Sequence, residues 1–186
     1  LDALGKECNT HIDIHGGIAT RNPEELLEIF KLLTWAKAAL TDSEHIPTAE
    51  LERALQRIAP SLRTLRHANG NLVRFQGGDQ GMEGMLDTAL AACGIKSRNS
   101  DHLTMGYARL SAGRTSVIID AGPPATGNAS YNAHASTLAF ELTSGRRPLI
   151  VSCGSGAHLG PDWHRAGRAT PSHSTLCLGG YSSARL

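Results

Sequence analysis

The chain has 186 residues, of which 19% are charged, and its formal net charge is +1. Such a balanced charge excludes a global electrostatic attraction to nucleic acid or to an anionic membrane surface. The longest apolar runs, such as residues 149–151, are far too short to cross a bilayer, so no membrane insertion is expected. The length is sufficient for one domain or for two small ones, each with a real core.

The four cysteines, Cys8, Cys93, Cys153 and Cys177, are widely spaced and form no C-x-x-C pair. We expect them to be ordinary and mostly buried thiols, which favours a reducing compartment. The chain starts at Leu1 rather than at methionine and shows no signal-peptide pattern there. An upstream domain or a signal peptide therefore stays open, and so does the choice between cytoplasm and periplasm.

The first third of the sequence predicts helices. Asn22 is a good N-cap and Pro23 suits the first helical position, which together predict a helix over residues 21–40. Its apolar residues cover more than one stripe, so burial on two sides is expected. Thr48 is placed to cap a second helix, antiparallel to the first. The second helix carries one apolar face, formed by Leu51, Leu55, Ile58, Leu62 and Leu65.

The character of the sequence changes at about Asn69, where glycines become frequent and short apolar runs alternate with turn residues. This pattern predicts an antiparallel β region interrupted by one helix over residues 82–93. Strands are predicted over residues 72–76, 104–112, 116–120, 137–143, 149–152 and 175–178. We therefore divide the chain into a helical part, residues 1–69, and a β part, residues 70–186.

Two details of the β region can be predicted more finely. Residues 112–114 and 144–147 have the composition of hairpin turns. The side chains expected to face the core of a β-sandwich are those of Tyr107, Leu110, Val117 and Ile119.

Four of the nine histidines fall between residues 132 and 175. His158 and His164 lie in a Gly-rich stretch and are expected to be exposed loop residues. His134 and His173 each precede a predicted strand, which is a rigid enough position for a functional site. Chance clustering of structural imidazoles is the alternative interpretation.

Several sequence blocks follow one another in a recognisable order. They are residues 132–142 (NAHASTLAFEL), 145–154 (GRRPLIVSCG), Trp163 and residues 168–176 (RATPSHSTL). This succession resembles the heparinase II/III-like family of polysaccharide lyases. Residues 16–23 (GGIATRNP) resemble the end of the family's helical domain. The resemblance extends over essentially the whole chain.

This resemblance implies an α+β fold, in which the C-terminal part of an α/α toroid is followed by an antiparallel β-sandwich, incomplete at both ends. It also implies a bacterial protein that cleaves acidic, uronic-acid-containing glycans by β-elimination. The implied partner is an acidic polysaccharide, with the remainder of its own chain or a homo-oligomer as further partners. No nucleic acid is implied.

The resemblance also assigns residues to the site. His134 takes the place of the histidine in the family's H-x-D motif and, with Asn132, is the candidate for catalysis. Tyr131 and Arg168 are the candidates for substrate binding. The family's metal site, carried over, would consist of His134, Ser152 and His173.

Three positions depart from the family pattern. Ser136 replaces the aspartate of H-x-D, Ser152 replaces the metal-binding aspartate, and Glu25 stands where active members carry a catalytic tyrosine. A serine hydroxyl is a poor zinc ligand and two imidazoles are too few, so no zinc is expected. Two functions therefore remain: a lyase, or a non-catalytic relative that binds an anionic polysaccharide or acts as an assembly scaffold.

Other motifs give weaker indications of function. Residues 154–156 lack the first glycine of a G-x-S-x-G nucleophile elbow, which argues against a serine hydrolase. Arg63, Arg66, His67 and Arg74 are either the lining of an anionic sugar groove or a solvated helix face.

Overall fold

The computed structural model of the chain describes residues 1–96 and 102–185. Its helices are α1 (Asp2–His11), α2 (Pro23–Asp42), α3 (Ala49–Thr64), α4 (Met85–Cys93) and α5 (Pro161–Arg168), with three short 3-10 helices, η1 (Gly127–Ser130), η2 (Ala157–Leu159) and η3 (Thr170–Ser172). Its strands are β1 (Tyr107–Ala112), β2 (Thr115–Asp120), β3 (Phe140–Ser144) and β4 (Arg147–Ile150).

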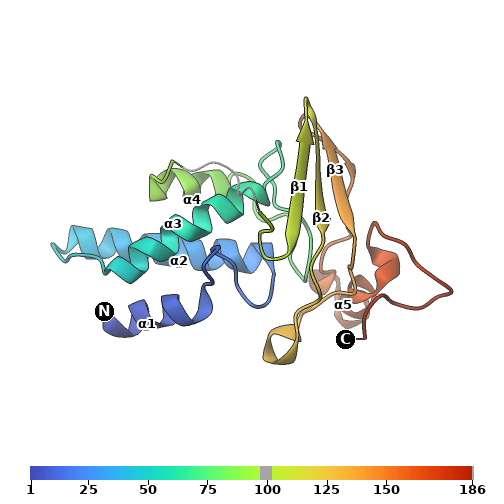
Figure 1. Cartoon of the computed structure of the whole chain (residues 1–186), viewed down its shortest axis with the longest axis horizontal. Helices are drawn as coiled ribbons and strands as arrows, with labels where there is room; N and C mark the ends of the chain where they lie inside the picture. The colour runs from blue at the N-terminus through green and yellow to red at the C-terminus, as the bar shows by residue number, and fades with distance from the viewer. Residues whose placement is uncertain (97–101, 186) are drawn as a thin grey trace.

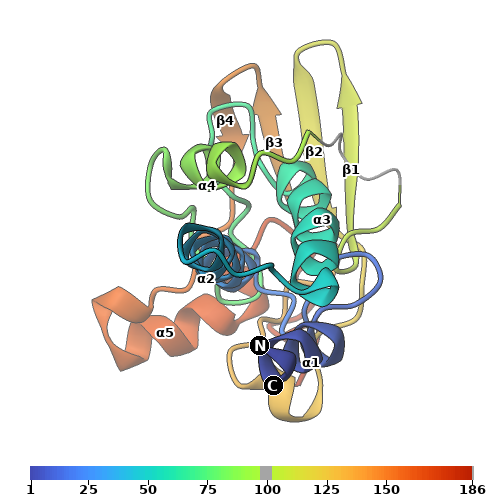
Figure 2. The same ribbon diagram turned by 90° about the vertical axis from the view of Figure 1, so that its left-hand side faces the viewer.

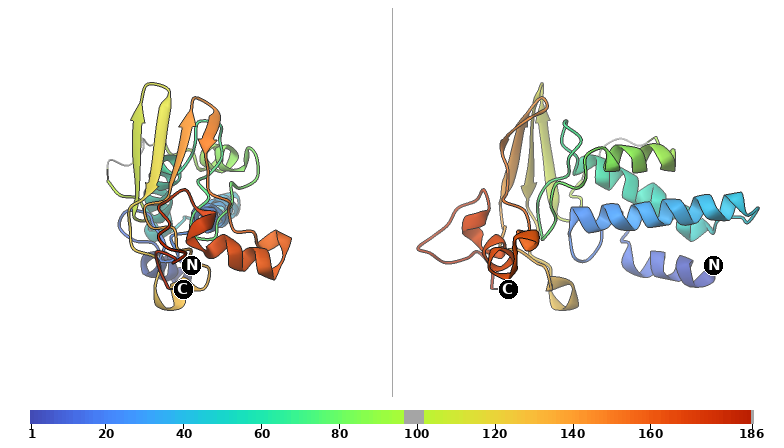
Figure 3. Two further views of the ribbon diagram at one scale, coloured as in Figure 1. Left: turned by 90° about the vertical axis from the view of Figure 1, so that its right-hand side faces the viewer. Right: turned by 180° about the vertical axis from the view of Figure 1, so that it is seen from behind.

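The helices and the sheet form successive layers (Figure 1). Helices α1 to α4 lie on one face of the sheet, whereas α5 and the C-terminal segment lie beside the other face, near one end of the strands (Figure 3). The prediction of an α+β fold, with helices first and antiparallel strands afterwards, is confirmed. The domain division near residue 69 remains a prediction.

The caps that the sequence predicts begin the two long helices. The side chain of Asn22 accepts hydrogen bonds from the backbone N–H groups of Glu24 and Glu25, with Pro23 at the start of α2. The hydroxyl of Thr48 accepts one from the N–H of Leu51 at the start of α3. These bonds satisfy backbone donors that the first helical turn leaves without partners.

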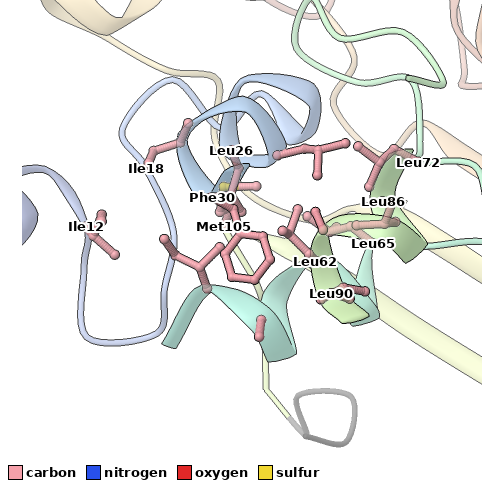
Figure 4. Close-up of a cluster of buried hydrophobic side chains, with 14 of the residues drawn as sticks. Ile12, Ile18, Leu26, Phe30, Leu62, Leu65, Leu72, Leu86, Leu90 and Met105 are labelled. Carbon is pink, nitrogen blue, oxygen red and sulfur yellow. The ribbon is translucent and has the colours of Figure 1, made fainter. Parts of the chain in front are cut away.

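The helical layer has its core between α2, α3 and α4 (Figures 2 and 4). The predicted apolar face of α3 is confirmed, because all five of its residues are buried: Leu51, Leu55, Ile58, Leu62 and Leu65. Helix α2 buries Leu26 and Phe30 against this face, but Leu32 and Trp35 are 59% and 62% exposed. The expectation that α2 is buried on two sides is therefore wrong for this chain.

The sheet is a simple antiparallel meander in the order β1-β2-β3-β4. Ala112 pairs with Thr115 and Ser144 pairs with Arg147, so each predicted turn is a two-residue hairpin loop. Gly113 starts the first loop at φ +58, a backbone conformation that side chains with a Cβ rarely adopt. The two outer hairpins of the meander are thus set by local turn chemistry.

The prediction of which sheet face is buried is partly wrong. Tyr107 is fully buried against the helical layer, but Leu110 is 60% exposed. Side chains alternate along a strand, so residues three apart lie on opposite faces. On β2, Ile118 is buried and both Val117 and Ile119 are only half-buried on the outer face.

Two predicted strands do not form. Residues 72–76 make only an isolated bridge, between Leu72 and Arg66, and residues 175–178 make only one, between Leu178 and Tyr181. Residues 72–76 instead run beside the sheet, where the ring of Phe75 stacks on Tyr107 with centroids 5.4 Å apart. Helices α1 and α5 were not predicted from the sequence.

Within residues 1–96 and 102–185, no helix combines the length and apolar character needed to span a membrane. All four cysteines are free thiols. Cys8 is buried and Cys93 is half-buried, but Cys153 and Cys177 are exposed, so the expectation of mostly buried thiols is wrong.

A buried ion pair joins the helical layer to the sheet. Arg21 lies just before α2, and its guanidinium pairs with the carboxylate of Asp120 at the end of β2. The same guanidinium donates from Nε to the carbonyl of Met105 at 2.6 Å. It also lies 4.8 Å from the ring centroid of Tyr107, whose hydroxyl donates to the carbonyl of Arg21 at 2.7 Å. The two layers are therefore joined through charge as well as through apolar packing.

We predict that Asp120→Ala lowers the free energy of unfolding by about 3–5 kcal/mol, because it leaves the Arg21 guanidinium buried without its anion. Glu28→Ala, which breaks the surface pair with Lys31, is the control and should cost less than about 1 kcal/mol. Urea denaturation of both variants measures the difference. Equal losses in the two variants would contradict a special role for the buried pair.

Candidate functional site

His134 and His173 lie next to each other, as the family resemblance implied. Their ring centroids are 5.2 Å apart with an interplanar angle of 54°. His134 belongs to the loop before β3 and His173 follows η3, so the expectation that each directly begins a strand is wrong. Both side chains are buried, with 1% and 7% of each residue exposed.

The two imidazoles have few hydrogen-bond partners. Nδ1 of His173 lies 3.4 Å from the hydroxyl of Ser152. Among the residues that the structure describes, both ring nitrogens of His134 and Nε2 of His173 have no hydrogen-bond partner. Such buried nitrogens are costly to leave unpaired and are common at functional positions.

The surroundings keep both rings neutral. Burial, followed by the charges of His173, Arg168 and His164, lowers the pKa of His134 to about 3. Burial also lowers the pKa of His173, although Asp120 and Glu141 act in the opposite direction. At neutral pH this pair therefore offers imidazole nitrogens rather than positive charge.

The donor set does not fit a zinc ion. His134 and His173 supply two imidazoles, and Ser152 supplies only a hydroxyl in the third family position. No group of three or more His, Cys, Asp or Glu side chains suited to a metal occurs within residues 1–96 and 102–185. Two neutral donors leave a dication under-coordinated and its charge uncompensated.

Ser136, which stands at the position of the H-x-D aspartate, is hydrogen-bonded to a buried carboxylate, that of Asp120 in β2. The hydroxyl of Ser136 donates to Oδ2 of Asp120 at 2.7 Å, and Nε2 of Gln76 donates to the same oxygen at 3.1 Å. Oε1 of Gln76 accepts from the backbone N–H of His134 at 3.0 Å. The Asp120 carboxylate is thus fully used in holding the His134 loop and Arg21.

A second buried carboxylate, Glu141 on β3, lies beneath Ser152. Its Oε1 accepts from the backbone N–H groups of Ser152 and Arg74, each at 3.1 Å. Its Oε2 lies 2.7 Å from Nε2 of His67, and both side chains are buried. Sequence reasoning missed Asp120 and Gln76, which lie outside the motif blocks that carry the resemblance. It also missed Glu141, which lies inside the block 132–142 but received no role there.

The remaining candidates, Tyr131, Asn132 and Arg168, belong to or contact the segment that leads to His134. The hydroxyl of Tyr131 donates to Glu25 at 3.2 Å, so the phenol meets the carboxylate that replaces the family's catalytic tyrosine. Burial and then Glu25 raise the pKa of Tyr131. Oδ1 of Asn132 lies 3.0 Å from Nε2 of His164, so His164 is a half-buried helix residue rather than the exposed loop residue expected.

Arg168 is hydrogen-bonded to the same segment. Its Nε donates to the carbonyl of Ala133 at 2.8 Å, and Nη2 donates to the carbonyl of Ser130 at 3.4 Å. Arg168 therefore holds the segment that contains Tyr131 and Asn132 and leads to His134.

The basic residues at the end of α3 do not form an anion groove. Arg66 makes a two-bond pair with Asp87, and Arg74 donates to the side chain of Gln80 at 2.6 Å. Arg63 donates to the carbonyl of Ile95, and His67 is buried. The interpretation of these four residues as an anionic sugar groove is wrong.

The helical layer and the antiparallel sheet have the architecture that the family resemblance implied. Residues 96–186 match the family model described as Heparinase II/III-like, C-terminal, so the C-terminal half of the chain carries this family's domain. The chain is 36% identical over 166 residues to FtsZ-localized protein C of Caulobacter vibrioides, covering 85% of this chain and 28% of that protein.

Solved structures show the same fold. A heparinase III matches with a TM-score of 0.75 at 17% identity, over 97% of this chain and 33% of that chain. The heparan sulfate lyase HepC of Pedobacter heparinus matches with a TM-score of 0.67 at 16% identity, again over 97% and 33%. The chain thus spans about a third of these structures, and the likeness concerns the fold alone.

The depressed pKa of His134 predicts a pH dependence of stability. Above pH 6.5 the ring is neutral in both states, whereas between pH 6.5 and about 3 only the unfolded chain binds the proton. The free energy of unfolding should therefore fall when the pH is lowered from 7.5 to 5. The fall should be about 2 kcal/mol larger in the wild type than in His134→Gln. Urea denaturation at the two pH values tests this, with exposed His158→Gln as control; a wild-type loss equal to that of His134→Gln would contradict it.

We also expect protein purified without chelator to contain no stoichiometric zinc, because the third ligand position is a serine. Elemental analysis of the full-length protein measures this directly. One zinc per chain that disappears in His173→Ala, but not in His158→Ala, would contradict the expectation.

Proposed function

We propose that this chain is a non-catalytic member of its family, which binds an acidic ligand and serves as an assembly module. The observation that carries the proposal is the chemistry around His134. Its imidazole is buried and neutral, and the nearby carboxylate of Asp120 is engaged by Arg21, Gln76 and Ser136. That carboxylate is therefore not free to act as an acid or a base beside the ring.

β-Elimination needs a base for the C5 proton, an acid for the leaving oxygen, and a charge that neutralises the uronate. Tyr107 cannot act, because it is buried against Arg21 and its pKa is well above the usual range, mainly through burial. Tyr131 is accessible, but the adjacent Glu25 disfavours its phenolate. A raised pKa makes a phenol a weaker base catalyst near neutral pH.

The similarity to FtsZ-localized protein C supports the assembly role. This relative is 36% identical, while the heparinase structures above are 16–17% identical. Its name states a location at FtsZ and no lyase activity. Fold likeness alone is a weak indication of activity, because function resides in the site.

A lyase is the second candidate, and one observation favours it. His134 and His173 are adjacent and have unpaired ring nitrogens. Tyr131 and Asn132 precede His134 in the chain, and Arg168 is hydrogen-bonded to the same segment. Residues from the two thirds of the related structures that this chain does not span would have to supply the missing acid and base.

The test is incubation of the full-length protein with heparan sulfate, alginate and related uronates. We expect retention of the protein on an immobilised acidic glycan, together with no ultraviolet absorbance from unsaturated uronate. A product signal that disappears in His134→Ala but persists in His158→Ala would replace the proposal with the lyase.

Co-sedimentation with FtsZ filaments gives a second readout, chosen from the relative's name. Pelleting with filaments, but not alone, is the expected result. Failure of both filament binding and glycan binding would overturn the assembly role.

A further inference from the structure

A basic groove lies along one face of α5, and neither His134 nor His173 lines it. Its cavity has a volume of about 510 Å³. Residues 161, 164, 165 and 168 line one side, and their spacing places them on a single helical face. Ser182, Ala184 and Arg185 of the C-terminal segment line the other side.

The two walls are fixed to the rest of the fold. Thr170, which is buried, accepts a hydrogen bond from the N–H of Ser183 at 2.7 Å, and its own N–H donates to Ser182 at 3.3 Å. Arg168 and His164 are held by the loop before β3. The groove is therefore a built concavity rather than a gap between loose segments.

The charged side chains that line the groove among the described residues are all positive. Arg165, Arg168 and Arg185 all line it, and none of the described residues that line it has a carboxylate side chain. The ion pairs found within the described parts of the chain include none of these three arginines. Asp162, the only acidic residue of α5, is not among the lining residues.

Helix electrostatics explain part of this arrangement but not all of it. Arg165 and Arg168 belong to the last turn of α5, where cations complement the negative end of the helix dipole. Arg185 comes from a separate segment and gains nothing from that dipole. Its placement across the groove brings a third positive charge to the same cavity, which otherwise costs repulsion.

We propose that this groove binds a phosphate monoester dianion. Guanidinium groups form paired, charge-assisted hydrogen bonds with phosphate oxygens, and the three positive charges of the groove fully compensate the phosphate charge of about −1.5 to −2. A sulfate monoester has a single negative charge and is matched less well. Ala169 and Ala184 provide apolar surface for the carbon skeleton of the ester.

Calorimetric titration of the chain with phenyl phosphate at pH 7.5 and low salt tests the proposal. We expect saturable binding, and binding of phenyl sulfate that is several-fold weaker. Arg165 and Arg185 are exposed, so Arg165→Gln combined with Arg185→Gln should leave folding unchanged. The affinity for phenyl phosphate should fall roughly tenfold or more in that variant.

Arg146→Gln, at the tip of the β3–β4 hairpin, is the control, because it removes an exposed arginine outside the groove. Its affinity should equal that of the wild type. Absence of binding by the wild type, or equal weakening in control and double variant, would overturn the proposal. Because the assay measures a small ester, its outcome is independent of glycan cleavage or FtsZ binding.

The source of the phosphoryl group is distinguished in two further arms. Glucose 6-phosphate represents a soluble ester, and phosphatidic acid in phosphatidylcholine vesicles represents a lipid headgroup. We expect the soluble ester to compete with phenyl phosphate and the vesicles to capture no protein, because the site is concave. If the vesicles capture the protein and the soluble ester does not compete, binding is a surface charge effect, and the proposal of a phosphate-binding groove is overturned.

Discussion

The ion pair between Arg21 and Asp120 is the constraint on which the rest of the arrangement depends. A charged side chain from the loop before α2 crosses into the sheet layer, where its guanidinium reaches the end of β2. A buried pair of this kind adds little net stability compared with apolar packing, but it is demanding in geometry. It therefore fixes how the helices pack on the sheet. Gln76 and Ser136, which both donate to Asp120, also hold the loop that carries His134 in place.

The same network changes the meaning of the departure at position 136. In the family's H-x-D motif an aspartate stands there, whereas here a serine hydroxyl donates to Asp120. A second carboxylate beside Asp120 would bring two negative charges together in a buried place, which is unfavourable unless a cation is shared between them. Serine removes that conflict. The loop is thereby held by hydrogen bonds from neutral side chains to a single carboxylate, which leaves no second acid at this position.

Much of the fold was predictable, because its signals are local. Asn22 and Thr48 cap helices, and Gly113 permits a tight hairpin, as their neighbours in sequence indicate. Helix α5 was missed, because it is short and glycines flank and interrupt its sequence. In the site, the approach of His134 to His173 followed from the family resemblance. The bonds of Gln76 did not, because they join segments 58 and 60 residues apart, and no local pattern encodes such pairings.

The mixed character of the sheet's inner face has a consequence for folding. Beside Tyr107 and Ile118 this face buries Glu141 and Asp120, while the apolar Val117 and Leu142 point outward and are only half-buried. A slip of β3 by one residue would turn Leu142 toward the helices and would carry Glu141 away from its three partners. Hydrophobicity alone would tolerate that slip. The correct register of β3 is therefore specified by the buried acidic side chains, because only that register gives them their hydrogen-bond partners.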